Sequence, residues 1–354
     1  MKIIKVIMDA GCNMHYAAFY IDGIRKKYEK KTVFSFNEFQ QFVDKNRCFL
    51  FKIITEKATF NVVIDFHDPR DIDSDMLLWS DVYAKINFHK QISKDFLLKS
   101  LDGNLELLNE NFPKIISIAP SFGIRVFNLS ETLQHLFFIL RNQKTKVAQE
   151  FKKVILDNLR MYIKRVPISN YFYVASSKKQ IFMMASIWHK TTSFVNLARA
   201  NFIRACQANP NIKFEGGFVA IGYECDYIPD LEKLKTGTKK MNLLTYICKT
   251  QQSLLVFNTP SVEYCHGWKI GEYLCLGKAI ISTALSNELP FPLEHGKNIH
   301  FVENNEDDIQ KAIQYFIDNP AYVQQLEHGA LQYWEQYCKP DKVIELIVAK
   351  LVQN

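Results

Sequence analysis

The chain has 354 residues, which is longer than one typical domain and enough for two domains with a core each. Hydrophobic residues make up 48% of the sequence and charged residues 23%, which are the proportions of a globular protein and exclude a disordered or fibrous chain. The formal net charge is +7, but acidic and basic residues are interspersed along most of the chain, so we expect no nucleic-acid partner.

The first apolar run of the sequence, residues 1–8, stops at Asp9. It is too short for the core of a signal peptide and far too short to cross a bilayer, so we interpret it as a buried strand. We therefore expect a cytoplasmic protein. Its basic excess suits a place beside anionic lipid headgroups, so the membrane contact to expect is peripheral, at the inner surface of the cytoplasmic membrane.

The first half of the chain alternates predicted strands and helices. After the strand at residues 3–8 and a turn, residues 14–28 have helical periodicity. Further strands are predicted at residues 32–36, 49–54, 61–66, 82–87 and 115–118. These strands lack alternation of polar and apolar residues, which is typical of a parallel sheet covered by helices on both faces. The strand at 82–87 is predicted to close one side of the sheet, and residues 130–165 are predicted to be helical.

A second series of strands and helices follows Pro167. Strands are predicted at residues 181–187, 211–218, 253–257, 279–282 and 298–302, and helices at 193–207, 243–249, 269–276 and over most of the remainder. We therefore predict an N-terminal α/β domain at residues 1–170 and a second at 171–335, with 336–354 as a helix returning to the first domain. Ligands of such domains bind at the carboxyl ends of the strands.

The eight cysteines show no CxxC pair and no histidines at metal-ligand spacing. This spacing favours reduced thiols over disulfides or a zinc site. We expect no bound metal and no cofactor.

A glycine just before a helix marks the most informative segment, residues 266–282. Gly267 lets a ligand approach the free amide N–H groups of the first helical turn, which together with the helix dipole favour a phosphate. Lys269 adds positive charge in the same place. We therefore predict a diphosphate site at this helix start, and a helix start packed shut against protein would contradict it.

Three further side chains are predicted to line this site. Glu272, about one turn beyond Trp268, can accept hydrogen bonds from ribose hydroxyls. His266 and Trp268 flank Gly267 and could equally belong to the core. Because Glu272 is expected at the helix start and outside the core, Glu272→Ala is expected to weaken ligand binding without harm to the fold.

The same segment resembles the nucleotide-sugar motif of GT-B glycosyltransferases, a loop glycine followed by a helix of the form E-x-L/M-A-x-G-K-P-V/I-I. Here Gly267 is followed by Glu272-Tyr273-Leu274-Cys275-Leu276-Gly277-Lys278-Ala279-Ile280-Ile281. The resemblance is closest to the group-1, GT4-like branch. It implies two Rossmann-like doubly wound domains facing a central cleft. It also implies sugar transfer from a nucleotide-diphosphate donor to a glycan or glycolipid acceptor, with retention of configuration and without a metal.

The resemblance also implies roles for single residues. In that branch the second glutamate of an E-x7-E motif holds the donor ribose, and Glu272 matches it, while Tyr264 stands in place of the first glutamate, beside Glu263. Lys190 lies where the family places a basic residue against the donor diphosphate. Asn258 is a further donor-site candidate because it follows a predicted strand at its carboxyl end.

For the acceptor side the sequence offers three candidate bases. His15 lies on the first loop, where the family has a glycine-containing loop near the acceptor, and His67 and Asp68 follow the strand at 61–66. A base must lie within hydrogen-bond reach of the acceptor hydroxyl. The alternative for each residue is that it caps the turn after a strand.

Two other functions are compatible with these features. A sugar-nucleotide epimerase of GT-B shape would share the diphosphate site but needs extra acidic groups in the cleft. A non-catalytic binding protein would keep the fold with a decayed site, and Tyr264 in place of the first glutamate favours it. Release of nucleoside diphosphate from a panel of nucleotide sugars separates these hypotheses.

Overall fold

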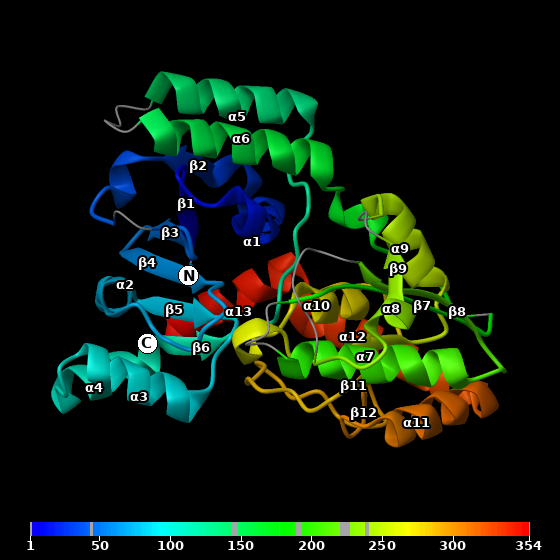
Figure 1. Cartoon of the computed structure of the whole chain (residues 1–354). Helices are drawn as coiled ribbons and strands as arrows, with labels where there is room; N and C mark the ends of the chain where they lie inside the picture. Colours follow the sequence, from blue (N-terminus) through cyan, green and yellow to red (C-terminus); the bar gives the residue numbers. More distant parts are fainter. Residues whose placement is uncertain are drawn as a thin grey trace. The chain divides into compact units, whose positions relative to one another are not determined.

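The computed structural model describes residues 2–42, 45–142, 148–176, 178–188, 193–219, 227–237 and 241–353. The chain forms two compact units (Figure 1). Unit 1 consists of residues 1–168, 288–290 and 337–354, and unit 2 consists of residues 169–287 and 291–336. No helix in the described part of the chain has both the length and the apolar character needed to cross a bilayer.

Unit 1 is built on one six-stranded sheet in the order β2-β1-β3-β4-β5-β6. Its strands are β1 (Ile3–Asp9), β2 (Thr32–Ser35), β3 (Cys48–Thr55), β4 (Thr59–Asp65), β5 (Val82–Lys85) and β6 (Ile115–Ser117). Strand β3 runs antiparallel to both β1 and β4, so the prediction of a parallel sheet is wrong here. Residues 56–58 are the whole connection from β3 to β4, and a parallel crossover needs a dozen residues or more. The prediction that 82–87 closes the sheet is also wrong, because β5 pairs with both β4 and β6.

Helices cover this sheet. They are α1 (Met14–Tyr28), α2 (Ser74–Trp79), α3 (Lys90–Ser100), α4 (Leu105–Asn111), α5 (Leu129–Asn142), α6 (Ala148–Lys164) and α13 (Pro340–Gln353). Helix α1 begins after Asn13, whose side chain accepts a hydrogen bond from the His15 amide and so caps the helix. Leu50, Val63 and Tyr83 belong to one buried cluster with apolar residues of α2, α3 and α4. Their neighbours along the strands point to the other face, because side chains alternate in a strand.

The C-terminal helix α13 packs on α1 within unit 1. A Cβ atom at Gly23 of α1 would lie 2.2 Å from the carbonyl oxygen of Pro340, so only glycine allows this approach. Lys27 of α1 and Glu345 of α13 form an ion pair 2.6 Å long. The last helix of the chain is thus part of the N-terminal unit.

Unit 2 contains two parallel three-stranded sheets, β7-β8-β9 and β10-β11-β12. The strands are β7 (Gln180–Ser186), β8 (Lys213–Val219), β9 (Lys235–Gly237), β10 (Val256–Asn258), β11 (Ile280–Ser282) and β12 (His300–Phe301). The sheets adjoin where the Leu254 amide, just before β10, donates to the carbonyl of Gln180 at 2.6 Å. The strands of this unit therefore lie in the order 3-2-1-4-5-6, which is that of a Rossmann fold.

Helices cover both faces of the unit 2 sheets. They are α7 (Ser193–Ala208), α8 (Leu231–Leu234), α9 (Leu243–Gln252), α10 (Trp268–Cys275), α11 (Glu306–Asp318) and α12 (Pro320–Tyr333). Ile181 and Met183 of β7 pack in one core with apolar residues of α7 and α11. Phe182 lies between them on the opposite face, where its ring contacts Tyr246 of α9. Unit 2 is therefore doubly wound, and its strand order reverses between β7 and β10.

Candidate functional site

The reversal point of unit 2 gathers polar groups at the carboxyl ends of β7 and β10. In sheets of this kind the crevice beyond the strand ends at the reversal point is the usual ligand site. Asn258 ends β10, and helix α10 begins ten residues later at Trp268. Residues 266–282, the segment that resembles the nucleotide-sugar motif, therefore lie at the edge of the sheet where a ligand is expected.

Two cationic side chains are anchored on the end of β7. The Lys269 ammonium donates to the Met184 carbonyl at 2.7 Å, and the Arg199 guanidinium donates to the Ser186 carbonyl at 3.1 Å. Burial lowers the pKa of Lys269 to about 7, with the Arg199 charge acting in the same direction and Glu272 opposing both. Burial also lowers the pKa of Arg199 to about 10. Positive charge is thus held in a desolvated place, where an anion would stabilise it.

Lys269 does not act where the sequence placed it. Its charge was expected in front of the first turn of α10, but the side chain instead reaches across to β7. The reason is that the Met184 carbonyl offers a hydrogen-bond acceptor to a long side chain leaving the first turn. The charge therefore joins the edge of the sheet and not only the helix start.

The start of helix α10 is open. Gly267 precedes the helix with no side-chain cap, and Gly267, Trp268 and Lys269 are each partly exposed. A Cβ atom at Gly267 would meet only Ser261, at 3.4 Å, and its φ of −72° is accessible to any residue. The helix start is therefore not packed shut, and the chain itself does not require a glycine there.

Glu272 lies deeper than the sequence analysis expected. It is the fifth residue of α10 and is buried, as are all residues from Ile270 to Cys275. The expectation that Glu272 lies at the helix start, outside the core, is therefore wrong, because this short helix buries every side of its second turn. Its carboxylate acts on Lys269, Tyr246 and Tyr273. Glu272→Ala must then be expected to perturb packing as well, while a role toward ribose stays a prediction.

The other donor-side candidates have different surroundings. His266 is buried, and Asn258 is buried with its amide donating to Ser282 Oγ at 2.9 Å. Trp268 is partly exposed at the first position of α10. Lys190 lies outside the described residues.

The backbone just before Gly267 has an unusual conformation. Glu263 and Tyr264 both lie in the left-handed region, with φ of 52° and 58°. Such strain costs roughly 1–3 kcal/mol per residue and tends to occur at ligand sites. The Tyr264 ring is exposed and stacks on Phe194, with ring centroids 4.5 Å apart. The position that departs from the E-x7-E motif therefore holds a strained, exposed aromatic residue.

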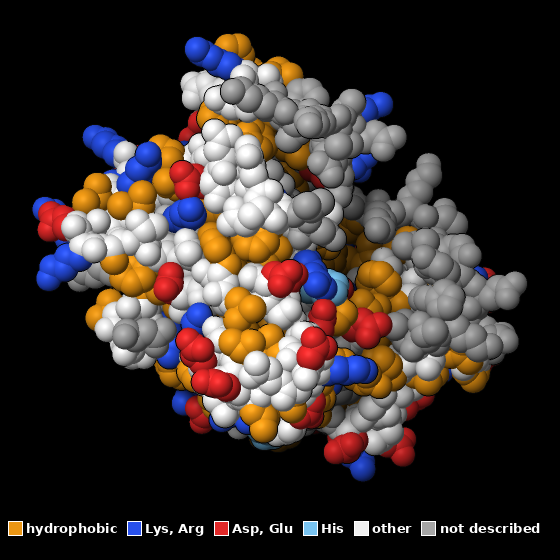
Figure 2. Space-filling view, turned by 90° about the vertical axis from the view of Figure 1, so that its left-hand side faces the viewer, with side chains coloured by type: hydrophobic (Ala, Val, Ile, Leu, Met, Phe, Trp, Pro, Cys, Tyr) orange, Lys and Arg blue, Asp and Glu red, His pale blue; other side chains and the backbone are white. Residues whose placement is uncertain are grey.

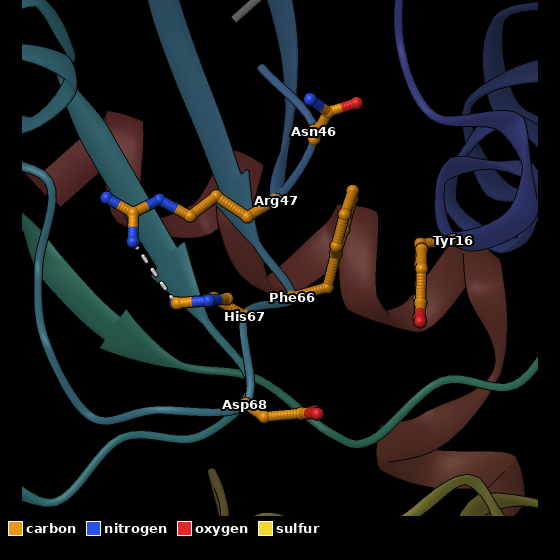
Figure 3. A pocket seen from close by; sticks show the side chains of 6 residues that line it. All are labelled: Tyr16, Asn46, Arg47, Phe66, His67 and Asp68. Atoms are coloured by element: carbon orange, nitrogen blue, oxygen red, sulfur yellow. Dashed lines mark hydrogen bonds between the residues drawn. The ribbon is translucent and has the colours of Figure 1, made fainter. Parts of the chain in front are cut away.

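A cavity of about 460 Å³ opens in unit 1 beside the end of β4. It is lined by Tyr16, Asn46, Arg47, Phe66, His67 and Asp68 (Figure 3). Two of the predicted bases, His67 and Asp68, thus share one cavity. The Tyr16 ring from α1 stacks on Phe66, with centroids 5.0 Å apart, and gives the cavity an aromatic wall.

His67 is held by a charged network. Its Nδ1 lies 3.2 Å from Arg47 Nη1 and 3.3 Å from Asp71 Oδ1. The hydrogen bond with His67, together with the Arg47 charge, lowers the pKa of Asp71 to about 2. Since Nδ1 is engaged, Nε2 is the ring nitrogen outside this network.

The backbone of His67 is fixed by a buried carboxylate. Asp65 accepts hydrogen bonds from the His67 amide at 2.8 Å, the Tyr83 hydroxyl at 2.6 Å and Lys85 Nζ at 2.9 Å. Asp65, at the end of β4, and Tyr83 and Lys85 of β5 are all buried. This cluster sets the place where the chain turns into the cavity.

His15 lies in a different cavity of unit 1, of about 330 Å³. Its lining is Asn13, His15, Asp157, Arg160, Met161, Lys164 and Arg165. Burial and the nearby Arg165 charge lower the pKa of His15 to about 4, so the ring is neutral at pH 7. The structure therefore does not bring His15 into one cavity with His67 and Asp68. The cationic lining is suited to an anionic group.

Solved structures of glycosyltransferases align with this chain at low identity and low TM-score. HepE from Anabaena, solved in complex with UDP, is 12% identical and aligns over 100% of both chains with a TM-score of 0.44. A glycosyltransferase from Rickettsia africae is 13% identical, with 96% of this chain and 82% of that chain aligned and a TM-score of 0.43. The C-terminal domain of a group-1 glycosyltransferase from Francisella tularensis aligns with 48% of this chain and 95% of its own, at 10% identity and a TM-score of 0.32.

No protein-family model matches the sequence, and no curated protein matches it either. Identities this low leave the chemistry to be inferred from this chain's own side chains. Among the residues that the structure describes, no three His, Cys, Asp or Glu side chains are grouped so that they could hold a metal ion.

The sequence analysis missed four residues of these sites: Arg199, Arg47, Tyr16 and Arg165. Only Arg199 could have been identified from the sequence pattern. Arg199 lies on α7 three and four residues before the buried Phe202 and Ile203, so it stands on the apolar face of a predicted helix. A lone arginine on such a face needs a buried partner. The other three come together only through the fold.

Gly267→Ala tests whether a ligand approaches the start of α10. We expect the free energy of unfolding of the variant to lie within about 1 kcal/mol of the wild-type value, because the added methyl group has room and φ is ordinary. Its affinity for UDP should fall about tenfold, because the methyl group would hold a phosphate away from the amide N–H groups. Calorimetric titration and thermal unfolding measure both. Unchanged affinity in the folded variant would remove Gly267 from the site.

Proposed function

We propose that the chain is a glycosyltransferase that moves a sugar from a nucleotide-diphosphate donor to a glycan or lipid-linked acceptor. The donor diphosphate binds in unit 2 at the start of α10, and the acceptor binds in unit 1. Transfer proceeds with retention of configuration and without a metal ion, as the motif resemblance implies. The cytoplasm is the expected location, since it supplies nucleotide sugars to such enzymes.

The observation that carries this proposal is the pair of desolvated cations at the reversal point of unit 2. Lys269 and Arg199 repel each other, and Glu272 is the carboxylate that acts on Lys269 in the described part of the chain. The positive end of the α10 dipole adds to them. A diphosphate would satisfy all three groups at once, and this supports a ligand with that charge.

These groups are suited to stabilise a leaving group. When the bond from sugar to phosphate breaks, negative charge grows on the diphosphate oxygens. Cations and N–H dipoles that are fixed beforehand lower the barrier, because they need no reorganisation during the reaction. Lys269 and Arg199 are fixed by the β7 carbonyls, which holds them ready for that charge.

The unit 1 cavities support an acceptor with a hydroxyl group and an anionic group. His67 and Asp68 line a cavity with an aromatic wall, of the kind that sugar rings stack on, and either side chain could accept the hydroxyl proton. Arg160, Lys164 and Arg165 line the neighbouring cavity and suit a phosphate on the acceptor. The pKa of His15, lowered to about 4, lies far from neutral pH, so this side chain is a weak base there.

A panel of UDP-, GDP- and ADP-sugars tests the proposal. The full chain is incubated with each sugar, with and without a metal chelator, and release of nucleoside diphosphate is measured. Release from at least one donor, unaffected by the chelator, is the expected result. Conversion to an epimeric sugar without release of diphosphate would indicate an epimerase. Neither release nor conversion, with binding retained, would indicate a binding protein.

The affinity for a nucleotide sugar should fall as the pH rises above 7. Lys269 has a pKa of about 7, so its charge is present below that pH and lost above it. A bound anion favours the charged form, and the affinity for UDP-glucose should drop by up to about tenfold between roughly pH 7 and pH 8. UDP-glucose is the probe because its diphosphate has no proton to lose near neutral pH. Lys269→Arg stays charged and should give a flat profile. A flat profile in the wild type would contradict the assignment.

A further inference from the structure

Helices α5 and α6 of unit 1 pack against each other and leave large apolar side chains exposed on their outer surface. Together these side chains form what we name the α5–α6 apolar face: Leu129, Leu133, Phe137 and Leu140 of α5, and Leu156, Leu159 and Ile163 of α6. Phe137 is 64% exposed and Ile163 is 76% exposed. A gathering of exposed apolar side chains on one folded unit indicates an interaction surface.

The spacing of these residues makes the exposure a property of the helices and not of single side chains. In α5 they follow one another at intervals of four, four and three residues, and in α6 at intervals of three and four. Such intervals place them on one face of each helix. Each helix therefore presents an apolar face to solvent, apart from the buried residues that face the unit.

Basic residues accompany this face. Residues 129–165 contain eight lysines and arginines against three acidic residues, so this short segment carries +5 of the formal net charge of +7. Among those described, Arg141, Lys152, Arg160 and Lys164 are exposed. Hydrophobic and basic side chains both appear at the top of Figure 2, the end of unit 1 formed by α5 and α6.

We propose that the α5–α6 apolar face docks on the surface of an anionic lipid bilayer, with both helices lying in the plane of the interface. The apolar side chains would enter the boundary between headgroups and acyl chains, and the cations would contact anionic headgroups. The proposal assigns the peripheral membrane contact expected from the basic excess to two helices of unit 1, and it does not depend on sugar transfer.

Lys152 distinguishes a bilayer from a protein partner. It precedes Leu156 by four residues and Leu159 by seven, so it stands on the same helix face as the apolar residues. The centre of a protein interface is depleted of lysine. At a bilayer a lysine on this face is favourable, because its stem lies along the apolar surface while its ammonium reaches the headgroups. The mixed face of α6 therefore fits a lipid surface.

Co-sedimentation of the full chain with vesicles tests this. We expect binding to vesicles of phosphatidylcholine with phosphatidylglycerol, weaker binding to phosphatidylcholine alone, and a loss of binding at high salt. Phe137→Ser with Ile163→Ser should lower the affinity about tenfold or more, since two exposed apolar anchors are lost. The matched control is Phe96→Ser with Leu105→Ser, which removes apolar side chains 49% and 60% exposed on α3 and α4. The control should bind vesicles as the wild type does.

A charge series completes the test. Arg141→Gln with Lys152→Gln should weaken binding to the anionic vesicles by about fivefold for each cation, whereas Lys57→Gln with Lys99→Gln should have no effect. Wild-type protein that stays in the supernatant with anionic vesicles overturns the proposal, as does equal loss in the control variants. Concentration-dependent dimers that Phe137→Ser disrupts, without vesicle binding, would assign the face to a second copy of the chain. Titration with UDP-glucose in the same variants keeps this outcome separate from the proposed function, since donor binding should not change.

Discussion

Replacing Lys269 with methionine should lower the rate of nucleotide-sugar turnover roughly hundredfold and leave the protein at least as stable as the wild type. The rate falls because a fixed cation that faces the developing charge of the diphosphate is removed, which costs roughly 3 kcal/mol. Stability is kept because the Lys269 charge is desolvated and repelled by Arg199 in the free protein. An apolar group of similar length removes both penalties, which together outweigh the attraction between Lys269 and Glu272 because the pKa of Lys269 is lowered.

Two measurements check this prediction together. Steady-state rates with the best donor of the panel give the loss of turnover, and denaturant unfolding gives the free energy of unfolding. A variant that is both slow and less stable would point to a structural lysine and contradict the assignment. Lys269→Arg should recover part of the rate, since the charge is restored at a similar reach.

The sequence was most informative about the elements of each unit. Helix α1 was predicted at residues 14–28 and is found there, since Asn13 supplies the cap and the apolar residues recur with helical spacing. The direction of β3 was missed, although residues 56–58 carry the signal, because apolar strands look alike whichever way they run. Local pattern defines a strand, whereas its direction follows from the length of its connection.

The sequence predicted the backbone elements of the candidate site but not the directions of its side chains. The glycine, the helix and its place at a strand end follow from residues 266–282, and the structure has them there. The direction of a long side chain does not follow from the sequence. Lys269 reaches β7, more than eighty residues earlier in the chain, and meets Arg199 from yet another helix. Such a cluster depends on packing that no local pattern records.

Lys278 lies in the same segment as Lys269, but its charge is paired within the protein. Its ammonium is fully buried and donates to Ser176 Oγ at 2.7 Å, to the Gln251 carbonyl at 3.0 Å and to Glu327 at 3.2 Å. Glu327 is fully buried too and also accepts from the Tyr173 hydroxyl at 3.2 Å. Burial lowers the pKa of Lys278, and the Glu327 charge opposes that shift. This lysine therefore completes a closed ion pair and has no charge to offer a ligand.

Lys278→Met should therefore destabilise the protein by roughly 3–5 kcal/mol, because it leaves the Glu327 carboxylate buried without its cation. Lys278→Met with Glu327→Met should recover most of that loss, since an apolar pair of similar volume is often as stable as the buried ion pair it replaces. Denaturant unfolding of the two single variants and the double variant gives the coupling between the two positions. A double variant no more stable than Lys278→Met would show that Glu327 is held by Ser176 and Tyr173 rather than by the lysine. If both predictions hold, the two lysines differ as the structure requires. Replacement of Lys269 lowers turnover and spares the fold, whereas replacement of Lys278 affects the fold alone.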